Sequence, residues 1–327
     1  MAYFLKRNKV LKNALGFILA VFMTVVSGSV SQAEDRRSLK LNQGTVGLLA
    51  SQPELIDDAI QIANAVDHTD GLRVLPIVGR GGLQSLNDLL FLRGVDAAML
   101  SSDSLAYVKK NQLYTIEADR ISYLAKLANE NIIILTRTEF ANLESLDGKR
   151  IATGNVNSDE FVAADLIFDD FGLTYERIPL SGSNAVAALK DGRIDAAILA
   201  GGASYQILAA IKSKSGLHIL PISLGKGLTE AYSPAIISSS DLPNLIPEGT
   251  VVETVAAALV LAVFDWPNRS ERFYKLRKFN AALFKNYLAS LSKEQKTNFS
   301  ATVPGWKPYP TEKDVIGSNP QSSTTIQ

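Results

Sequence analysis

"GVDAAML" (Gly94–Leu100) and "GRIDAAIL" (Gly192–Leu199) are two copies of one short pattern in different parts of the chain. Each copy ends a longer segment with the same order of parts, and these segments are Leu72–Leu100 and Tyr175–Leu199. In both, an apolar run leads to a turn rich in glycine or serine, an amphipathic stretch, a glycine and a second apolar run. This order predicts strand, turn, helix and strand, which is a βαβ unit. Two such units predict an α/β protein with two lobes, each containing a parallel sheet.

Gly94 and Gly192 stand between each predicted helix and the strand that follows it. A residue in the left-handed conformation lets the chain reverse direction there, and glycine adopts that conformation most readily. Asp96 and Asp195 come next, at the entrance to the strand, where we expect them to accept hydrogen bonds from backbone N–H groups. A catalytic pair is the less favoured interpretation, because no acid or base partner lies near either aspartate in the sequence.

The first 33 of the 327 residues have the pattern of a cleavable signal peptide. A basic segment precedes the apolar run Ala14–Val26, and Ser31 and Ala33 are small residues placed for cleavage. The basic residues are Lys6, Arg7, Lys9 and Lys12. The alternative is an uncleaved anchor, but this apolar run falls short of the roughly 20 residues that span a bilayer. We therefore expect export to the periplasm.

The composition excludes several classes of protein. There is no cysteine, so disulfide frameworks, thiolate metal sites and cysteine nucleophiles are ruled out. The hydrophobic share of 46% is typical of a packed globular protein. Removing residues 1–33 removes basic but no acidic residues, which leaves the remaining chain slightly acidic. This balance argues against nucleic acid or an anionic membrane surface as a partner.

The predicted elements divide the exported chain into a discontinuous lobe and an inserted one. Residues 38–136 form the first part of lobe 1, residues 137–228 form lobe 2, and residues 229–315 return to lobe 1. Two strands crossing between the lobes act as a hinge, and residues 316–327 have the composition of a disordered tail. We expect a two-lobed α/β fold, with the ligand cleft between the lobes.

The candidate ligand-binding residues lie in loops that follow predicted strands, where open α/β sheets bind ligands. In lobe 1 they are Ser51, Gln52, Arg80, Gly81, Gly82, Ser101, Ser102 and Asp103. In lobe 2 they are Asn157, Ser158, Ser183, Gly201, Gly202 and Ser204. Such loops offer backbone N–H groups and short hydroxyls to a small anion. Arg80 could pair with a carboxylate or phosphonate, or it could be bonded to nearby carbonyl groups or solvated.

Enzyme motifs are incomplete. "GRGG" (Gly79–Gly82) does not continue into a dinucleotide-binding pattern, and "LGKG" (Leu224–Gly227) lacks the other residues of a phosphate loop. His68 lies in a polar turn and His218 in an apolar strand, so we expect neither a metal site nor a serine–histidine dyad. We predict no catalytic residue, no metal and no cofactor.

The segment "GRGGLQSLNDLLFLRGVDAAMLSSD" (Gly79–Asp103) resembles one that recurs in TAXI-type receptors of tripartite TRAP transporters. Later landmarks are similar to that family in the same order. They are "LDGKRIATGN", "LKDGRIDAAILAGGAS", "LIPEGTV" and "VPGWKPYP". The resemblance covers most of the exported chain and implies a two-lobed solute receptor with a periplasmic-binding-protein-like fold of type II.

The resemblance also implies site residues. The ligand-loop glycines of the family fall on Gly81 and Gly82, and two further motifs fall on Ser101–Asp103 and Asn157–Glu160. This chain departs from the pattern where Asp159 and Glu160 replace glycine and threonine, which adds negative charge. It also lacks the usual glycine-rich first loop, which supports the expectation of no metal.

Together these observations predict a monomeric periplasmic receptor that captures a small, anionic organic solute between two lobes. It would deliver this solute to a TRAP-type membrane transporter. A periplasmic sensory subunit and an enzyme of the same two-lobed fold are the alternatives. The sensory subunit would report to a signalling protein, and the enzyme would need a nucleophile or histidine in the cleft.

Overall fold

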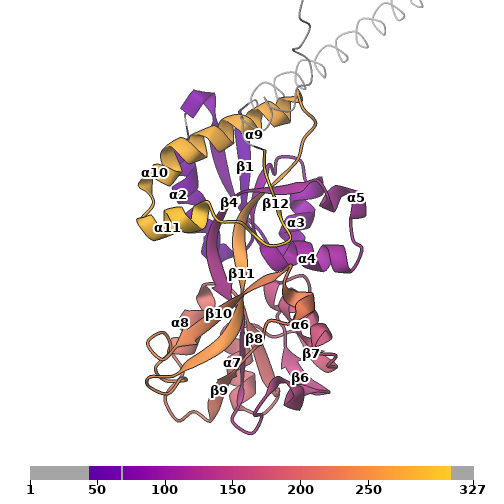
Figure 1. Ribbon diagram of the computed structural model, residues 1–327, viewed down its shortest axis with the longest axis vertical. Helices are drawn as coiled ribbons and strands as arrows, with labels where there is room; N and C mark the ends of the chain where they lie inside the picture. Colours follow the sequence, from indigo (N-terminus) through magenta and orange to yellow (C-terminus); the bar gives the residue numbers. More distant parts are fainter. Residues whose placement is uncertain (1–43, 68, 311–327) are drawn as a thin grey trace, which may run out of the picture. The chain divides into compact units, whose positions relative to one another are not determined.

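The computed structural model describes residues 44–67 and 69–310 (Figure 1). The predicted signal peptide, residues 1–33, and the predicted tail, residues 316–327, lie outside the described residues. Two separate sheets are present, and each is accompanied by helices. The predicted two-lobed α/β class is therefore confirmed.

The sheet of lobe 1 has the strand order β12-β4-β11-β3-β1-β2, and β10 also pairs with β11. Its strands are β1 (Thr45–Ala50), β2 (Arg73–Val78), β3 (Ala97–Ser101), β4 (Ile121–Asn131), β10 (Tyr232–Ser238), β11 (Val251–Phe264) and β12 (Lys307–Pro308). Strands β1 and β3 are parallel, whereas β11 runs antiparallel to both β3 and β4. Strand β11 lies between β4 and β3 in this sheet. The C-terminal part of the chain therefore contributes a central strand to the core of lobe 1.

Helices cover both faces of this sheet. On one face, Ile62 of α2 and Phe279 of α9 pack with Leu48 in a fully buried core. On the other face, Leu86 of α3 and Leu105 of α4 pack against the strands. The helices of lobe 1 are α2 (Ile56–Val66), α3 (Gly82–Phe91), α4 (Ser102–Lys110), α5 (Thr115–Ala118), α9 (Glu271–Ala282), α10 (Leu288–Ser290) and α11 (Lys293–Phe299). Among the described residues, no helix is long and apolar enough to cross a membrane.

Short helical segments complete both lobes and their connections. They are η1 (Pro53–Leu55), η2 (Thr69–Gly71), η3 (Leu143–Leu146), η4 (Lys226–Leu228) and the π-helical η5 (Leu283–Tyr287). The sequence predicts one long amphipathic helix after Asn268, and the structure interrupts it at η5. Its predicted apolar stripe, which includes Phe273 and Leu276, is buried as core packing.

The sheet of lobe 2 has the order β7-β6-β8-β5-β9. Its strands are β5 (Ile133–Arg137), β6 (Lys149–Ala152), β7 (Tyr175–Ile178), β8 (Ala196–Leu199) and β9 (Leu217–Leu220). Strand β6 is parallel to β7 and to β8, and β5 is antiparallel to β8 and β9. The helices are α6 (Asp159–Asp170), α7 (Gly182–Lys190) and α8 (Ala203–Ala209). The second βαβ unit of the sequence is thus β7–α7–β8.

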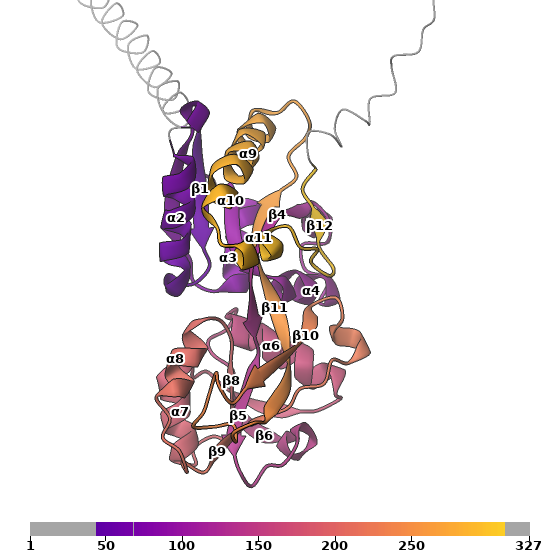
Figure 2. The ribbon, with the colours of Figure 1, turned by 60° about the vertical axis from the view of Figure 1, so that its left-hand side comes forward.

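The segments that cross between the lobes are the β4–β5 junction and the paired strands β10 and β11 (Figure 2). The chain passes from β4 to β5 at Ile132, whose backbone N–H donates to the Val255 carbonyl of β11 at 2.9 Å. The Thr254 hydroxyl donates to the Ile132 carbonyl, so the two segments are tied together at the crossing. The sequence places the end of the first lobe segment at Thr136, within β5. The apolar run Ile132–Leu135 begins at the crossing and continues into β5, which is why the predicted boundary falls after this run.

The two repeated aspartates have the predicted backbone role. Asp96 Oδ2 accepts a hydrogen bond from Gly47 N at 3.0 Å, and Asp195 Oδ2 accepts one from Arg150 N at 3.0 Å. Gly94 and Gly192 precede them with φ of 94° and 70°, in the predicted left-handed conformation. Each copy of the repeat therefore joins a helix end to a neighbouring strand by the same local chemistry.

Replacing Asp195 by alanine is expected to lower the free energy of unfolding by about 2 kcal/mol, because hydrogen bonds to charged groups are among the stronger ones. Arg150 and Arg137 both donate to its carboxylate at 3.0 Å. Burial opposes these bonds, yet they hold the pKa of Asp195 at about 2. Urea denaturation at neutral pH measures the loss. The exposed Asp191–Arg193 pair supplies the control, since Asp191→Ala is expected to change stability little.

Candidate ligand-binding site

The lobes contact one another through loops at the carboxyl ends of strands. Gln52, which follows β1, donates its side-chain N–H to Asp159 Oδ2 at the start of α6. Leu83 N of α3 donates to the Asn157 carbonyl at 3.3 Å. Helix α6 begins here because Ser158 caps it, accepting from Phe161 N at 3.2 Å. We call this junction, defined by Gln52, Gly81, Gly82, Asn157 and Asp159, the interlobe site.

Gly81 and Gly82 allow the two lobes to approach this closely. A Cβ atom on Gly81 would stand 2.9 Å from the Asn157 carbonyl oxygen and 3.3 Å from Ser158 Cα. A Cβ atom on Gly82 would overlap Asp159 Oδ1. Gly81 also has φ of 111°, which side chains rarely tolerate. Glycine at these positions therefore determines how close the helix N-terminus of lobe 2 lies to lobe 1.

Four carboxyl groups gather around the interlobe site. Asp103 and Asp159 are buried, Glu130 is 9% exposed, and Glu160 lies next to Asp159 at the start of α6. Their charges act on one another, because Asp103, Glu130 and Glu160 all contribute to the shifted pKa of Asp159. Tyr232 reaches the group from β10 and donates its hydroxyl to Asp103 Oδ2 at 2.9 Å.

Burial is the main cause of the raised pKa values in this group. It raises the pKa of Asp103 to about 6, and the hydroxyl of Tyr232 opposes the rise only in part. Burial and then the charge of Asp103 raise the pKa of Glu130 to about 7. The pKa of Asp159 lies well above its usual range, and burial also raises the pKa of Glu160. The site thus holds carboxyl groups that are easily protonated and poorly paired.

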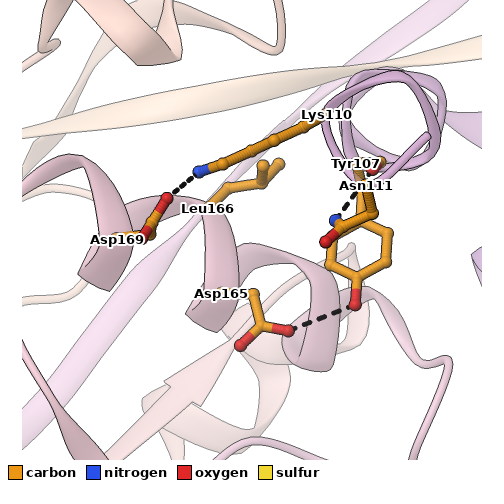
Figure 3. A pocket seen from close by; sticks show the side chains of 6 residues that line it. All are labelled: Tyr107, Lys110, Asn111, Asp165, Leu166 and Asp169. Carbon is orange, nitrogen blue, oxygen red and sulfur yellow. Dashed lines mark hydrogen bonds and ion pairs between the residues drawn. The ribbon is translucent and has the colours of Figure 1, made fainter.

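A second contact between the lobes lies to the side of this group, between α4 and α6. A cavity of about 290 Å³ is lined there by Tyr107, Lys110, Asn111, Asp165, Leu166 and Asp169 (Figure 3). Lys110 pairs with Asp169, and the Tyr107 hydroxyl donates to Asp165 Oδ2 at 3.3 Å. Asp165 is also held by Tyr175 and Arg177 from β7. The contacts of Lys110 and Tyr107 with α6 therefore join the two lobes outside the interlobe site.

A model of the NMT1-like family matches residues 61–278, which is most of the chain. The chain belongs to the NMT1-like family. Solved structures are similar to it at low identity. They include a protein from Bordetella bronchiseptica RB50, with 13% identity, a TM-score of 0.48 and coverage of 79% of this chain and 76% of that one. The aliphatic sulphonate binding protein SsuA from Escherichia coli has 14% identity, a TM-score of 0.42 and coverage of 75% and 70%. An ancestral arginine-binding protein has 15% identity, a TM-score of 0.43 and coverage of 74% and 93%.

In this NMT1-like chain, the structure brings together only part of the residue set predicted from sequence. Gln52, Gly81, Gly82 and Asn157 meet directly across the interlobe site. Gly201 joins them from lobe 2, because a Cβ atom on it would lie 3.2 Å from Gln52 Oε1. Asp103 belongs to the surrounding carboxyl group.

The other predicted residues have internal or exposed positions. The Ser102 hydroxyl donates to the Ala231 carbonyl and accepts from Ala258 N, and the Ser204 hydroxyl donates to the Ala200 carbonyl. The remaining predicted residues divide by exposure. Ser51 and Ser101 are buried, Ser158 caps α6, and Arg80, Ser183 and Gly202 are exposed. A role for these residues in ligand binding stays a prediction.

Glu130 and Tyr232 lie at the site but were not among the residues predicted from the sequence. Glu130 stands in "NEN" (Asn129–Asn131), a polar break in an otherwise apolar strand just before the crossing, and that break was the available signal. Tyr232 carries no comparable signal, because it reaches Asp103 only through the pairing of β10 with β11.

The described residues offer little that would suit catalysis or metal binding. His218 bonds through Nε2 to the Phe140 carbonyl at 2.8 Å within lobe 2, and His68 lies outside the described residues. Within residues 44–67 and 69–310, no group of three or more histidine, aspartate or glutamate residues is arranged to hold a metal ion.

Proposed function

We propose that this NMT1-like chain is a periplasmic receptor that captures a small solute between its two lobes. The observation that supports it most directly is the meeting of polar groups from both lobes at the interlobe site. Asp159 Oδ1 and Ser104 Oγ are buried there without a hydrogen-bond partner among the described residues. Buried polar atoms without partners are destabilising, so a protein that keeps them side by side has a use for them in binding.

The segments that cross between the lobes allow capture by closure. The β4–β5 junction at Ile132 and the paired strands β10 and β11 run between the lobes, so the lobes can move about them as about a hinge. A solute that touches one lobe stabilises the open and closed states equally. One that touches both lobes favours the closed state by its additional contacts. At micromolar affinity, about 8 kcal/mol is available for binding and closure together.

The edge contact between α4 and α6 suits reversible closure. Lys110 and Asp169 remain 45% and 67% exposed, and exposed ion pairs contribute little net stability. This contact therefore orients the closed lobes without locking them, and the solute supplies the decisive energy.

The closed receptor would deliver its solute to a TRAP-type membrane transporter, as the resemblance to TAXI receptors implies. In this role the chain acts as a monomer with no cofactor and no catalytic step. Closure brings surface from both lobes into one fixed arrangement, which a membrane partner can distinguish from the open form.

Native mass spectrometry of protein purified without denaturation tests the receptor function. We expect a retained small molecule that leaves on unfolding, and a rise in melting temperature when it is added back. Loss of uptake of this solute on deletion of the gene would link capture to transport. A protein that carries no solute, and whose melting temperature responds to no acid, base or neutral metabolite, would contradict capture.

A further inference from the structure

The interlobe site carries a strong excess of acidic over basic side chains. Asp103, Glu130, Asp159 and Glu160 lie within one another's electrostatic reach, and Asp58 adds to the field at Glu130. Among the described residues, no lysine or arginine counts among the causes that shift the pKa of these four. A cation bound in this place would therefore favour the ionised forms of several carboxyl groups at once.

Two buried oxygen atoms without a hydrogen-bond partner lie close to Gly82. Asp159 is 3% exposed and Ser104 is fully buried, and neither Asp159 Oδ1 nor Ser104 Oγ has a hydrogen-bond partner. Both lie directly over Gly82, since a Cβ atom there would overlap Asp159 Oδ1 and stand 2.7 Å from Ser104 Oγ. The other oxygen of Asp159 is already used by Gln52. An N–H donor from a ligand could reach both free oxygens at once.

From this arrangement we infer that the solute is an organic cation, an amine or guanidine whose charged N–H groups bind Asp159 and Ser104. The inference rests on the proposed receptor function and replaces the anionic solute expected from the sequence. Arg80, the basis of that expectation, is exposed, whereas the buried groups at the site are carboxyls.

The charge balance explains why a cation would close the lobes. Bringing Asp159 against Asp103 and Glu130 places like charges together in a buried region, which disfavours closure while they are ionised. A bound ammonium or guanidinium compensates these charges and donates the missing hydrogen bonds. An anion in the same place would add to the repulsion.

Melting-temperature and calorimetric titrations with matched probes test the inference. Putrescine and agmatine represent cations with N–H donors, succinate and glutarate represent anions, and xylitol represents neutral polyols. We expect at least one cation to raise the melting temperature at neutral pH and the anions to have no effect. Asp159→Asn is expected to weaken binding of that cation by roughly 10- to 100-fold, since it removes one charge-assisted hydrogen bond.

Two further variants keep the result interpretable. Asp191→Asn makes the same chemical change at an exposed ion pair of α7 and is expected to bind the cation as the unmodified protein does. Glu130→Gln provides a second alteration of the carboxyl group if Asp159→Asn fails to fold, and is also expected to weaken binding.

Each outcome decides between the alternatives. Cation binding that Asp159→Asn weakens and Asp191→Asn does not would support the inference. Binding of succinate or glutarate, or cation binding indifferent to both site variants, would overturn it and leave the receptor function standing. If no cation binds, the inference fails, and a retained solute in native mass spectrometry then shows whether the receptor function survives.

Discussion

Replacing Gly81 by alanine is expected to weaken solute binding about 100-fold by preventing closure of the lobes, a change of about 2.7 kcal/mol. The new Cβ atom would stand 2.9 Å from the Asn157 carbonyl oxygen and 3.3 Å from Ser158 Cα. Both are backbone atoms of the loop that starts α6, so they cannot rotate away as the end of a long side chain could. Calorimetric titration with the retained solute measures the loss of affinity.

Gly94→Ala is the matched control for this prediction. Gly94 has φ of 94°, close to the 111° of Gly81, but nothing lies within 4 Å of a Cβ atom placed on it. Both variants therefore carry backbone strain, on the order of 1–3 kcal/mol. Only Gly81→Ala also obstructs the other lobe. Equal affinity of the two variants for the solute would contradict closure at this junction. Small-angle X-ray scattering should also show that the Gly81→Ala variant stays open when solute is added.

Stability is expected to fall as the pH rises from about 4 to about 8, by about 3 kcal/mol for each of Asp103 and Glu130. Their pKa values are raised to about 6 and about 7 from 3.8 and 4.5, mainly by burial. The folded state therefore binds more protons than the unfolded state within this window. The contribution of these two carboxyl groups to the free energy of unfolding is fully present below this window. It has been lost above about pH 8, where the groups are ionised in both the folded and the unfolded state.

Urea denaturation across this pH range measures the slope. Asp103→Asn and Glu130→Gln are each expected to flatten it, because an amide does not titrate. The groups that act on Glu130 are Asp103, Asp58 and Glu160, so its variant should also alter the titration of Asp103. A slope unchanged in both variants would show that these carboxyls do not carry the effect.

Asp195 provides the opposite sign within the same protein. Its pKa is lowered to about 2 by hydrogen bonds from Arg150 and Arg137, against the effect of burial. Its contribution is present at neutral pH and is lost as the pH falls through about 4 toward about 2. Asp195→Ala should therefore change the acid limb of the profile and leave the slope between about pH 5 and pH 8 in place.

If the solute is a cation, its binding should reduce the fall in stability that the free protein shows as the pH rises toward about 8. A bound ammonium group favours the ionised carboxylates and so lowers their pKa values in the complex. The difference in melting temperature between complex and free protein is then larger at about pH 8 than at about pH 5.

Local sequence was sufficient for the features that depend on near neighbours along the chain. The repeat that contains Asp96 and Asp195 predicted two α/β lobes. It could do so because glycine turns and alternating strand and helix patterns are set by residues close in sequence. The cap of α6 is local in the same way, because the Ser158 hydroxyl accepts from Phe161 N three residues later. Gly81 and Gly82, predicted as ligand-binding residues, lie at the junction of the lobes, and their role in binding stays a prediction.

The charge of the site was decided only by tertiary structure. Asp103, Glu130 and Asp159 come from α4, β4 and α6, and nothing in their local sequence shows that the fold buries them together. Arg80 stands in the right loop by sequence, yet it is exposed. Tyr232 reaches Asp103 because β10 pairs with β11, a contact between distant parts of the chain. A pKa depends on burial and on neighbouring charges, and both arise only when the chain has folded.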